Sequence, residues 1–101
     1  MPTVIYGMLK EEKQRNLELQ EAYAKEIKLL PKGSLVAKRR NGRTYYYLRY
    51  REKDKVKTDY VGKDDSSVED IRRGIAKRKQ LEIVARRLRT EYKQICKIVK
   101  E

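Results

Sequence analysis

The chain has 101 residues, of which 42% are charged and 39% hydrophobic, and its formal net charge is +12. This length allows one small domain with a modest core. The single cysteine, Cys96, and the lack of histidine exclude an intrachain disulfide and any recognisable zinc spacing. No apolar run approaches the roughly 18 residues of a membrane span, and no signal peptide is recognised, so we expect a cytoplasmic protein without membrane contact.

Residues 8–30 are predicted to form the first helix. Apolar residues from Leu19 to Leu30 recur at the four- and three-residue spacing of one helical face. Glutamates dominate the first half of the segment and lysines the second, which suits the helix dipole. Pro31 is expected to stop the helix. The residues before Met8 are interpreted as a poorly ordered extension or as the product of an ambiguous start site.

Residues 34–62 are predicted to form a three-stranded antiparallel meander, because runs rich in aromatic and β-branched residues alternate with turn signals. Asn41-Gly42 supplies the positive φ angles that a tight hairpin requires, and a second turn is expected at 52–55. The expected strands are 34–39, 44–51 and 56–61.

Residues 66–100 are predicted to form one long helix. Gly74 is its weak point, since glycine costs roughly 1 kcal/mol against alanine, and is expected to mark a kink or close packing. The start of the helix has short polar and acidic residues typical of a capping box: Asp64, Asp65, Ser66 with Glu69, and Ser67 with Asp70.

An apolar seam runs from Leu81 to Val99 at alternating four- and three-residue steps, with a phase slip near Arg78. It is expected to close on the first helix or on a second copy, which predicts a monomer or a homodimer through the C-terminal helix. The predicted fold class is α+β, with an N-terminal helix, a three-stranded antiparallel meander and a long C-terminal helix in a single small domain, 1–101.

The positive charge is concentrated on the predicted sheet. Residues 31–63 carry eleven Lys and Arg against three Asp and Glu, which is +8 of the total +12, and five of the eight tyrosines. Concentrated positive charge indicates an anionic partner, and tyrosine rings stack on unpaired bases for about 1–3 kcal/mol each. DNA or RNA is therefore the predicted partner.

Alternating side chains give the central strand two faces. The face with Leu48 also carries Tyr46 and Tyr50, and is expected to lie inward under one or both helices. The opposite face, with Tyr45 and Tyr47, is expected to contact nucleic acid. All the predicted contact residues are basic or aromatic: Arg39, Arg40, Arg43, Tyr45, Tyr47, Arg49, Arg51, Lys55, Lys57, Lys63, Arg72, Arg73, Lys77 and Arg78.

Catalysis is not expected. Without histidine, general acid–base chemistry would fall on carboxylates, lysine or tyrosine, and the carboxylates lie at helix starts and on solvated faces. The glycines lack any phosphate-cradling spacing. Cys96, beside Ile95 on the flank of the seam, is interpreted as a packing residue. No catalytic residue, metal site or cofactor is predicted.

The segment from Leu30 to Lys63 contains L-P-K-G-S, then G-R-T-Y-Y-Y-L-R-Y-R, then K-V-K-T-D-Y-V-G-K. This pattern resembles a family of small, uncharacterised bacterial and phage proteins with flanking helices, over roughly residues 9–95. The portion from Tyr50 also looks like short segments near the N-termini of some transposases. The resemblance implies mobile elements or phages and cytoplasmic handling or sensing of nucleic acid; it implies no catalytic residue.

The first functional hypothesis is a non-enzymatic nucleic-acid-binding module of phage or mobile-element type. The alternative is a protein-interaction module, such as an anti-CRISPR-like, phage-encoded inhibitor of a host nucleic-acid enzyme. It would use the same basic face on a host protein or ribonucleoprotein. A purely structural alternative also stays open, in which the tyrosines form core in a chain without Phe or Trp and the arginines are simply solvated.

Overall fold

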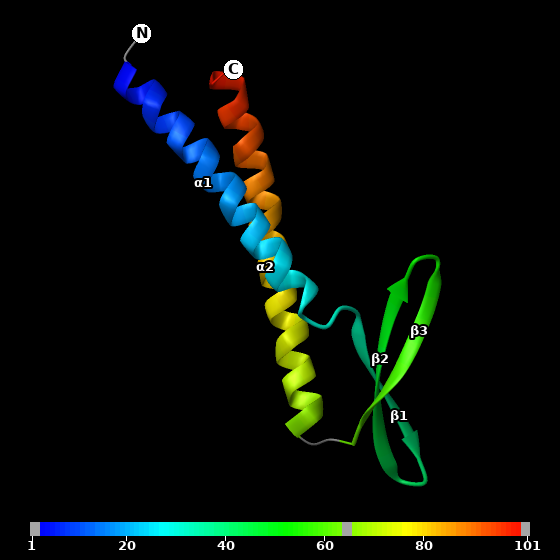
Figure 1. Cartoon of the computed structure of the whole chain (residues 1–101). Helices are drawn as coiled ribbons and strands as arrows, with labels where there is room; N and C mark the ends of the chain where they lie inside the picture. The colour runs from blue at the N-terminus through cyan, green and yellow to red at the C-terminus, as the bar shows by residue number, and fades with distance from the viewer. Residues whose placement is uncertain (1–2, 64–65, 100–101) are drawn as a thin grey trace. The chain divides into compact units, whose positions relative to one another are not determined.

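The computed structural model describes residues 3–63 and 66–99 (Figure 1). Along the chain it contains α1 (Thr3–Lys28), β1 (Ser34–Arg40), β2 (Arg43–Glu52), β3 (Lys55–Gly62) and α2 (Ser66–Ile98). The strands form one antiparallel sheet in the order β1-β2-β3, which confirms the predicted α+β class. The chain divides into two compact units, which we call the helical unit (α1 with α2 from Gln80 onward) and the sheet unit (Leu30–Lys79).

α1 begins earlier than predicted, at Thr3, so residues 3–7 of the segment interpreted as an extension are helical, whereas residues 1–2 lie outside the described residues. Gly7 is its one poor helix former, and the roughly 1 kcal/mol that glycine costs does not break the helix. At the other end, α1 stops at Lys28 instead of residue 30. The backbone N–H of Leu29 donates to the carbonyl of Glu26 at 3.1 Å, a three-residue step that tightens the last turn.

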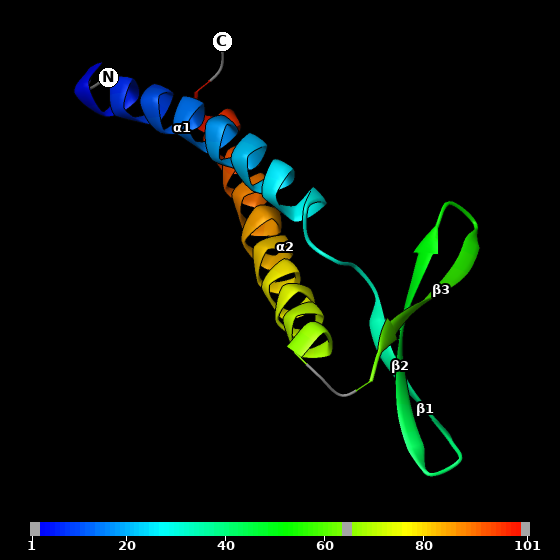
Figure 2. The same ribbon diagram turned by 60° about the horizontal axis from the view of Figure 1, so that its bottom comes forward.

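In the helical unit, α1 and the second half of α2 lie side by side and antiparallel (Figures 1 and 2). The Nδ2 atom of Asn16 donates to the carbonyl of Leu88 at 3.0 Å, and the Nε2 atom of Gln20 donates to Oδ1 of Asn16 at 2.6 Å. Lys13 lies over the ring of Tyr92, 6.0 Å from its centroid. These contacts set the register of the two helices.

The core of the helical unit is small. Among its described residues, only Asn16, Ala85 and Val99 are buried. The seam of α2 from Leu81 to Val99 is buried or half-buried, so it closes on α1 within the chain.

The sheet is three strands wide only at its centre. β1 pairs with Arg43–Arg49, whereas β3 pairs with Tyr46–Glu52. The two hairpins therefore project from opposite ends of the sheet as two-stranded arms (Figure 1). We call them the first arm (Lys38–Tyr45) and the second arm (Tyr50–Lys57).

Both hairpin turns form where they were predicted. Asn41 and Gly42 have φ angles of 51° and 76°, as a two-residue hairpin turn requires. In the second arm Lys53 has a φ of 56° although it is not a glycine. Each strand extends one residue beyond its predicted range at one or both ends, because ladder hydrogen bonds continue to the edge of each turn.

The first half of α2 packs closely on the segment that leads into the sheet. Val68 is fully buried. The Nη1 atom of Arg78 donates to the carbonyl of Leu30 at 2.7 Å. A Cβ atom added at Gly74 would lie only 2.8 Å from Cγ and Cδ of Pro31. Close packing is therefore the correct alternative at Gly74, and α2 continues through it.

α2 begins at Ser66, as predicted, and ends at Ile98 instead of residue 100. Residue 100 lies outside the described residues, as do Asp64 and Asp65. Within the described ranges, no helix is long and apolar enough to cross a membrane. The same residues contain no group of three His, Cys, Asp or Glu side chains that could hold a metal ion.

Candidate nucleic-acid interface

Strand pairing sorts the sheet into two faces, because directly opposed residues of antiparallel strands point to the same side. We call one face outer and the other inner. The outer face contains Ser34, Val36, Lys38, Arg40, Arg43, Tyr45, Tyr47, Arg49, Arg51, Val56, Thr58 and Tyr60. The inner face contains Leu35, Ala37, Arg39, Thr44, Tyr46, Leu48, Tyr50, Glu52, Lys55, Lys57 and Asp59.

Charge is segregated between these two faces. The strands are described in full, and both of their acidic residues, Glu52 and Asp59, belong to the inner face. The outer face has five basic residues and no acidic one. It therefore has an uninterrupted positive field beside its tyrosines.

Three tyrosines form a cluster on the outer face. The ring of Tyr60 packs edge-on against Tyr47, with centroids 5.4 Å apart, and lies tilted 6.4 Å from Tyr45. Tyr45 and Tyr47 are half-buried, whereas Tyr60 is 57% exposed. Tilted and edge-on pairs are favourable ring geometries, so the cluster is an ordered aromatic platform with one open ring.

Cations adjoin this platform. The Nζ atom of Lys38 lies 5.0 Å from the centroid of the Tyr47 ring, within range of a cation–π interaction. A shallow depression next to it is lined by Val36, Lys38, Arg49, Val56 and Thr58. Aromatic surface and cationic groups thus lie within one side-chain length of each other.

The inner face is turned toward the first half of α2, as predicted. The guanidinium of Arg72 lies 6.0 Å from the centroid of the Tyr46 ring. The Nζ atom of Lys32, in the segment before β1, lies 6.0 Å from the Tyr50 ring. Tyr46, Leu48 and Tyr50 are all half-buried, as expected of a partly covered face.

Polar and charged groups of the inner face pair with one another in and next to the second arm. The hydroxyl of Tyr50 donates to Oδ2 of Asp59 at 2.8 Å, and this hydrogen bond is the main reason why the pKa of Tyr50 is raised above 10.0. The ammonium of Lys57 lies 3.1 Å from a carboxylate oxygen of Glu52. Hydrogen bonding to Glu52 likewise raises the pKa of Lys57 above 10.5.

The predicted basic residues of the sheet fall on both faces. Arg40 and Arg43 lie on the outer face of the first arm, whereas Arg39 lies on the inner face; all three are exposed. Lys55 and Lys57 lie on the inner face, so they do not border the tyrosine cluster. Lys63 is exposed just after β3.

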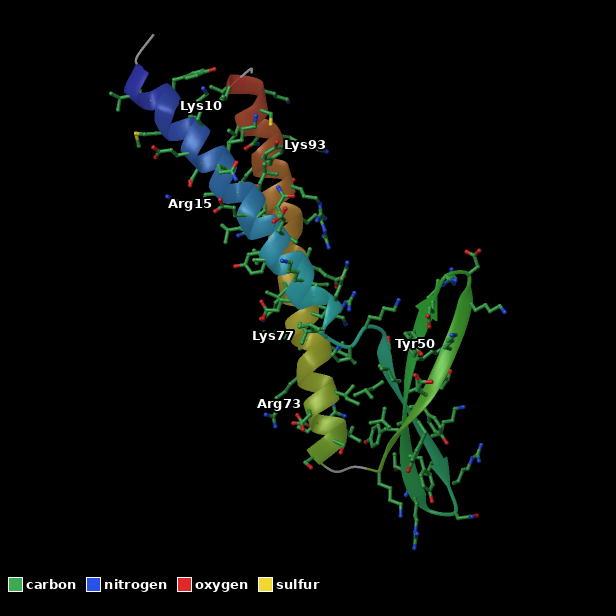
Figure 3. The ribbon with its side chains drawn as sticks, in the orientation of Figure 1. Lys10, Arg15, Tyr50, Arg73, Lys77 and Lys93 are labelled. Carbon is green, nitrogen blue, oxygen red and sulfur yellow. The ribbon has the colours of Figure 1, made fainter. Side chains whose placement is uncertain are left out.

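The predicted cluster on α2 is not continuous with the outer face. Arg72 is bound to Glu69 at 2.7 Å and covers Tyr46, and Arg78 donates to a backbone carbonyl. Figure 3 shows Arg73 and Lys77 on the side of α2 turned away from the sheet. The row is divided because successive residues on a helix are rotated by about 100°, so Arg72 and Arg73 point in different directions.

Two outer-face residues were missed in the sequence, Tyr60 and Lys38. Tyr60 is found by counting outward from the second turn, which pairs residue 52 with 55 and, in unbroken register, brings Tyr60 opposite Tyr47. Lys38 is found in the same way from Asn41-Gly42, since it pairs with Tyr45. Counting residues outward from a hairpin turn therefore predicts cross-strand partners that composition alone does not reveal.

Comparison with known proteins gives one family. The sequence model of a family described as a domain of unknown function, DUF6788, matches residues 9–73, which are 65 of the 101 residues. The matched range includes all three strands and both faces of the sheet. No curated protein and no solved structure matches the chain.

Proposed function

The chain belongs to the DUF6788 family, and we propose that it is a non-enzymatic nucleic-acid-binding module that holds unpaired bases against the outer face of its sheet. The observation that carries the proposal is the segregation of charge. Five basic residues and three tyrosines share the outer face, and the acidic residues of the strands lie on the other one.

The tyrosine cluster favours binding of single-stranded nucleic acid over binding of a duplex. Bases in a duplex are stacked on each other, whereas unpaired bases are free to stack on aromatic side chains, as they do on small sheets in known RNA-binding modules. Each stacked base contributes about 1–3 kcal/mol. Tyr60 is the open ring of the cluster, so it is the proposed first contact.

The basic residues are proposed to bind the phosphates on either side of the stacked bases. Arg40 and Arg43 lie toward the tip of the first arm, Arg49 and Arg51 toward the second, with Lys38 between them. A single-stranded nucleic acid that lies along β2 would therefore meet cations at both ends of the tyrosine cluster. Five phosphate contacts to a single strand predict a slope of about −3.5 for log K against log salt concentration.

The test is fluorescence anisotropy of labelled single- and double-stranded DNA and RNA, titrated with the full chain at several salt concentrations. Tyr60→Ala should weaken single-strand binding about 5- to 150-fold, which corresponds to the loss of 1–3 kcal/mol, whereas Tyr60→Phe keeps the ring and should bind normally. Arg40→Ala should also weaken binding.

Arg39→Ala is the matched control, because Arg39 is the exposed neighbour of Arg40 on the inner face of the same arm. Equal losses at both arginines would contradict the outer-face interface and favour insertion of the whole first arm into a groove. No binding to any naked nucleic acid would reject the proposal. It would favour the protein-interaction alternative, in which the same surface occupies an acidic groove on a host protein.

A further inference from the structure

The two arms of the sheet differ in charge, although each is a two-stranded hairpin. The first arm (Lys38–Tyr45) carries four Lys and Arg and no acidic residue, so its net charge is +4. The second arm (Tyr50–Lys57) also carries four Lys and Arg, but Glu52 and Asp54 reduce its net charge to +2. Glu52 in addition holds Lys57 in an ion pair at 3.1 Å. An anionic partner is therefore attracted more strongly to the first arm.

The arginines of the first arm are available to such a partner. Arg39, Arg40 and Arg43 are all exposed, and no ion pair or hydrogen bond to a described residue holds their guanidinium groups. Arg40 and Arg43 lie on the outer face of the arm, whereas Arg39 lies on the inner face. A partner that contacts one face needs cations on that face alone. Guanidinium groups on both faces suit an anionic partner that surrounds the arm.

The first arm is also free to enter such a partner, because no third strand lies beside it. β3 pairs with β2 only as far as Tyr46, and β1 is the edge strand on the other side. The arm therefore projects beyond the sheet as a two-stranded ribbon (Figures 1 and 2).

The dimensions of the arm fit the major groove of a DNA duplex, whose two walls are lined by phosphates. From Tyr45 to Gly42 the arm spans about 10 Å, at about 3.4 Å for each of three residue steps. The major groove of B-DNA is about 12 Å wide and about 8.5 Å deep, and it admits a two-stranded β-ribbon. The minor groove, about 6 Å wide, is too narrow for the ribbon. The major groove of an RNA duplex is narrow as well.

The tyrosine cluster lies where the first arm joins the sheet. Tyr45 is the last residue of the arm, and its ring lies 6.4 Å from that of Tyr60. Tyr47 follows two positions later on the same face. A DNA strand that leaves a duplex seated on the arm therefore meets the aromatic rings directly.

We propose that the chain binds DNA at a junction between duplex and single strand. The first arm inserts into the major groove of the duplex, and the outer face holds the unpaired bases that adjoin it. Arg39 then contacts the phosphates of the groove wall opposite to that contacted by Arg40. The second arm stays outside the groove, since phosphates repel the carboxylates of Glu52 and Asp54.

This inference rests on the proposed function, because it takes the single-strand site on the outer face as its starting point. It goes further in two respects. It specifies duplex DNA as the partner of the first arm, and it gives Arg39, which lies outside the single-strand site, a role in binding.

The test is fluorescence anisotropy of the full chain with three labelled DNA probes: a single strand, a blunt duplex, and a duplex with a single-stranded overhang of either polarity. The duplex part has about ten base pairs, one helical turn. The overhang has about eight nucleotides, within the usual site size of a small single-strand-binding domain. The single strand is as long as the longer strand of the junction probe.

The junction probe should bind at least about tenfold more tightly than the single strand or the blunt duplex, since one hydrogen bond to a charged group contributes about that factor. A junction probe whose duplex part is RNA should not show this gain, because the arm does not fit the narrow groove.

Arg39→Ala should weaken junction binding about tenfold and make its salt dependence shallower by about 0.9 in log–log slope. Its binding to the single strand should be unchanged, because Arg39 lies on the inner face. Lys55→Ala is the matched control: it removes one exposed positive charge from the same face of the second arm. It should bind both probes normally. Circular dichroism checks that each variant is folded.

Equal affinity for the junction and the single strand would overturn the inference and leave the proposed function intact. An RNA duplex that serves as well as DNA would also overturn it, as would an Arg39→Ala variant that behaves like Lys55→Ala on the junction. Failure of the proposed function is seen separately, as the absence of binding to the single strand, and the inference would fail with it.

Discussion

Gly74→Ala should destabilise the protein, although this substitution usually stabilises a helix. Helix propensity alone favours alanine over glycine by about 1 kcal/mol. At Gly74, however, the new Cβ would lie 2.8 Å from Cγ and Cδ of Pro31, well inside the 3.5–4.0 Å at which carbon atoms attract each other. Overpacking costs about 1–3 kcal/mol, and the proline ring has no rotamer by which to move aside. We therefore expect the free energy of unfolding to fall by about 0–2 kcal/mol.

Urea denaturation followed by circular dichroism measures this change. Gly7→Ala is the control, because a Cβ at Gly7 meets nothing within 4 Å, so it should raise the free energy of unfolding by up to about 1 kcal/mol. Pro31→Ala removes Cγ and Cδ, and in that background Gly74→Ala should become stabilising. The double-mutant cycle should give a coupling energy of about 1–3 kcal/mol between the two positions.

The reasoning is refuted if Gly74→Ala raises the free energy of unfolding as much as Gly7→Ala does. It is also refuted if the cycle shows no coupling, because the cost would then not come from the contact with Pro31.

Three further predictions follow from individual contacts. The hydrogen bond from Tyr50 to Asp59 raises the pKa of Tyr50, so its contribution to stability is complete below pH 10 and is lost as pH rises through the raised pKa. A hydrogen bond with Cys96 raises the pKa of Tyr92 as well, so ultraviolet titration should show two late tyrosines, of which Asp59→Asn returns only Tyr50 toward the ordinary range. Gly33→Ala should lower the free energy of unfolding by at least about 2 kcal/mol, because Gly33 has a φ of 106° and a Cβ there would collide with the carbonyl oxygen of Arg49. An unchanged melting temperature of this variant would contradict this account. Asn16→Ala should lower the free energy of unfolding, measured by urea denaturation, by about 1–3 kcal/mol, because it removes the buried amide that joins α1 to a backbone carbonyl of α2. An unchanged free energy of unfolding would show that water replaces that hydrogen bond.

The order of helices and strands was predictable from the sequence because it depends on local signals. The two turns, Pro31 after the first helix and the spacing of apolar residues each act over a few residues. The start of α1 was not predictable. Apolar periodicity is weak around Gly7, and this part of the helix extends from the more strongly periodic segment that follows it. Alternation along β2 also predicted correctly that Tyr46 faces α2 and that Tyr45 does not.

Local sequence patterns are sufficient to predict the element order, the hairpin turns and the concentration of positive charge on the sheet. Which of those charges share a face depends on tertiary contacts. Strand register paired Lys57 and Asp59 with inner-face partners and brought Tyr60 to the tyrosine cluster. The rotation of α2 against the sheet directed Arg73 away from it. Register and rotation result from contacts between residues far apart in the chain, which no local pattern contains.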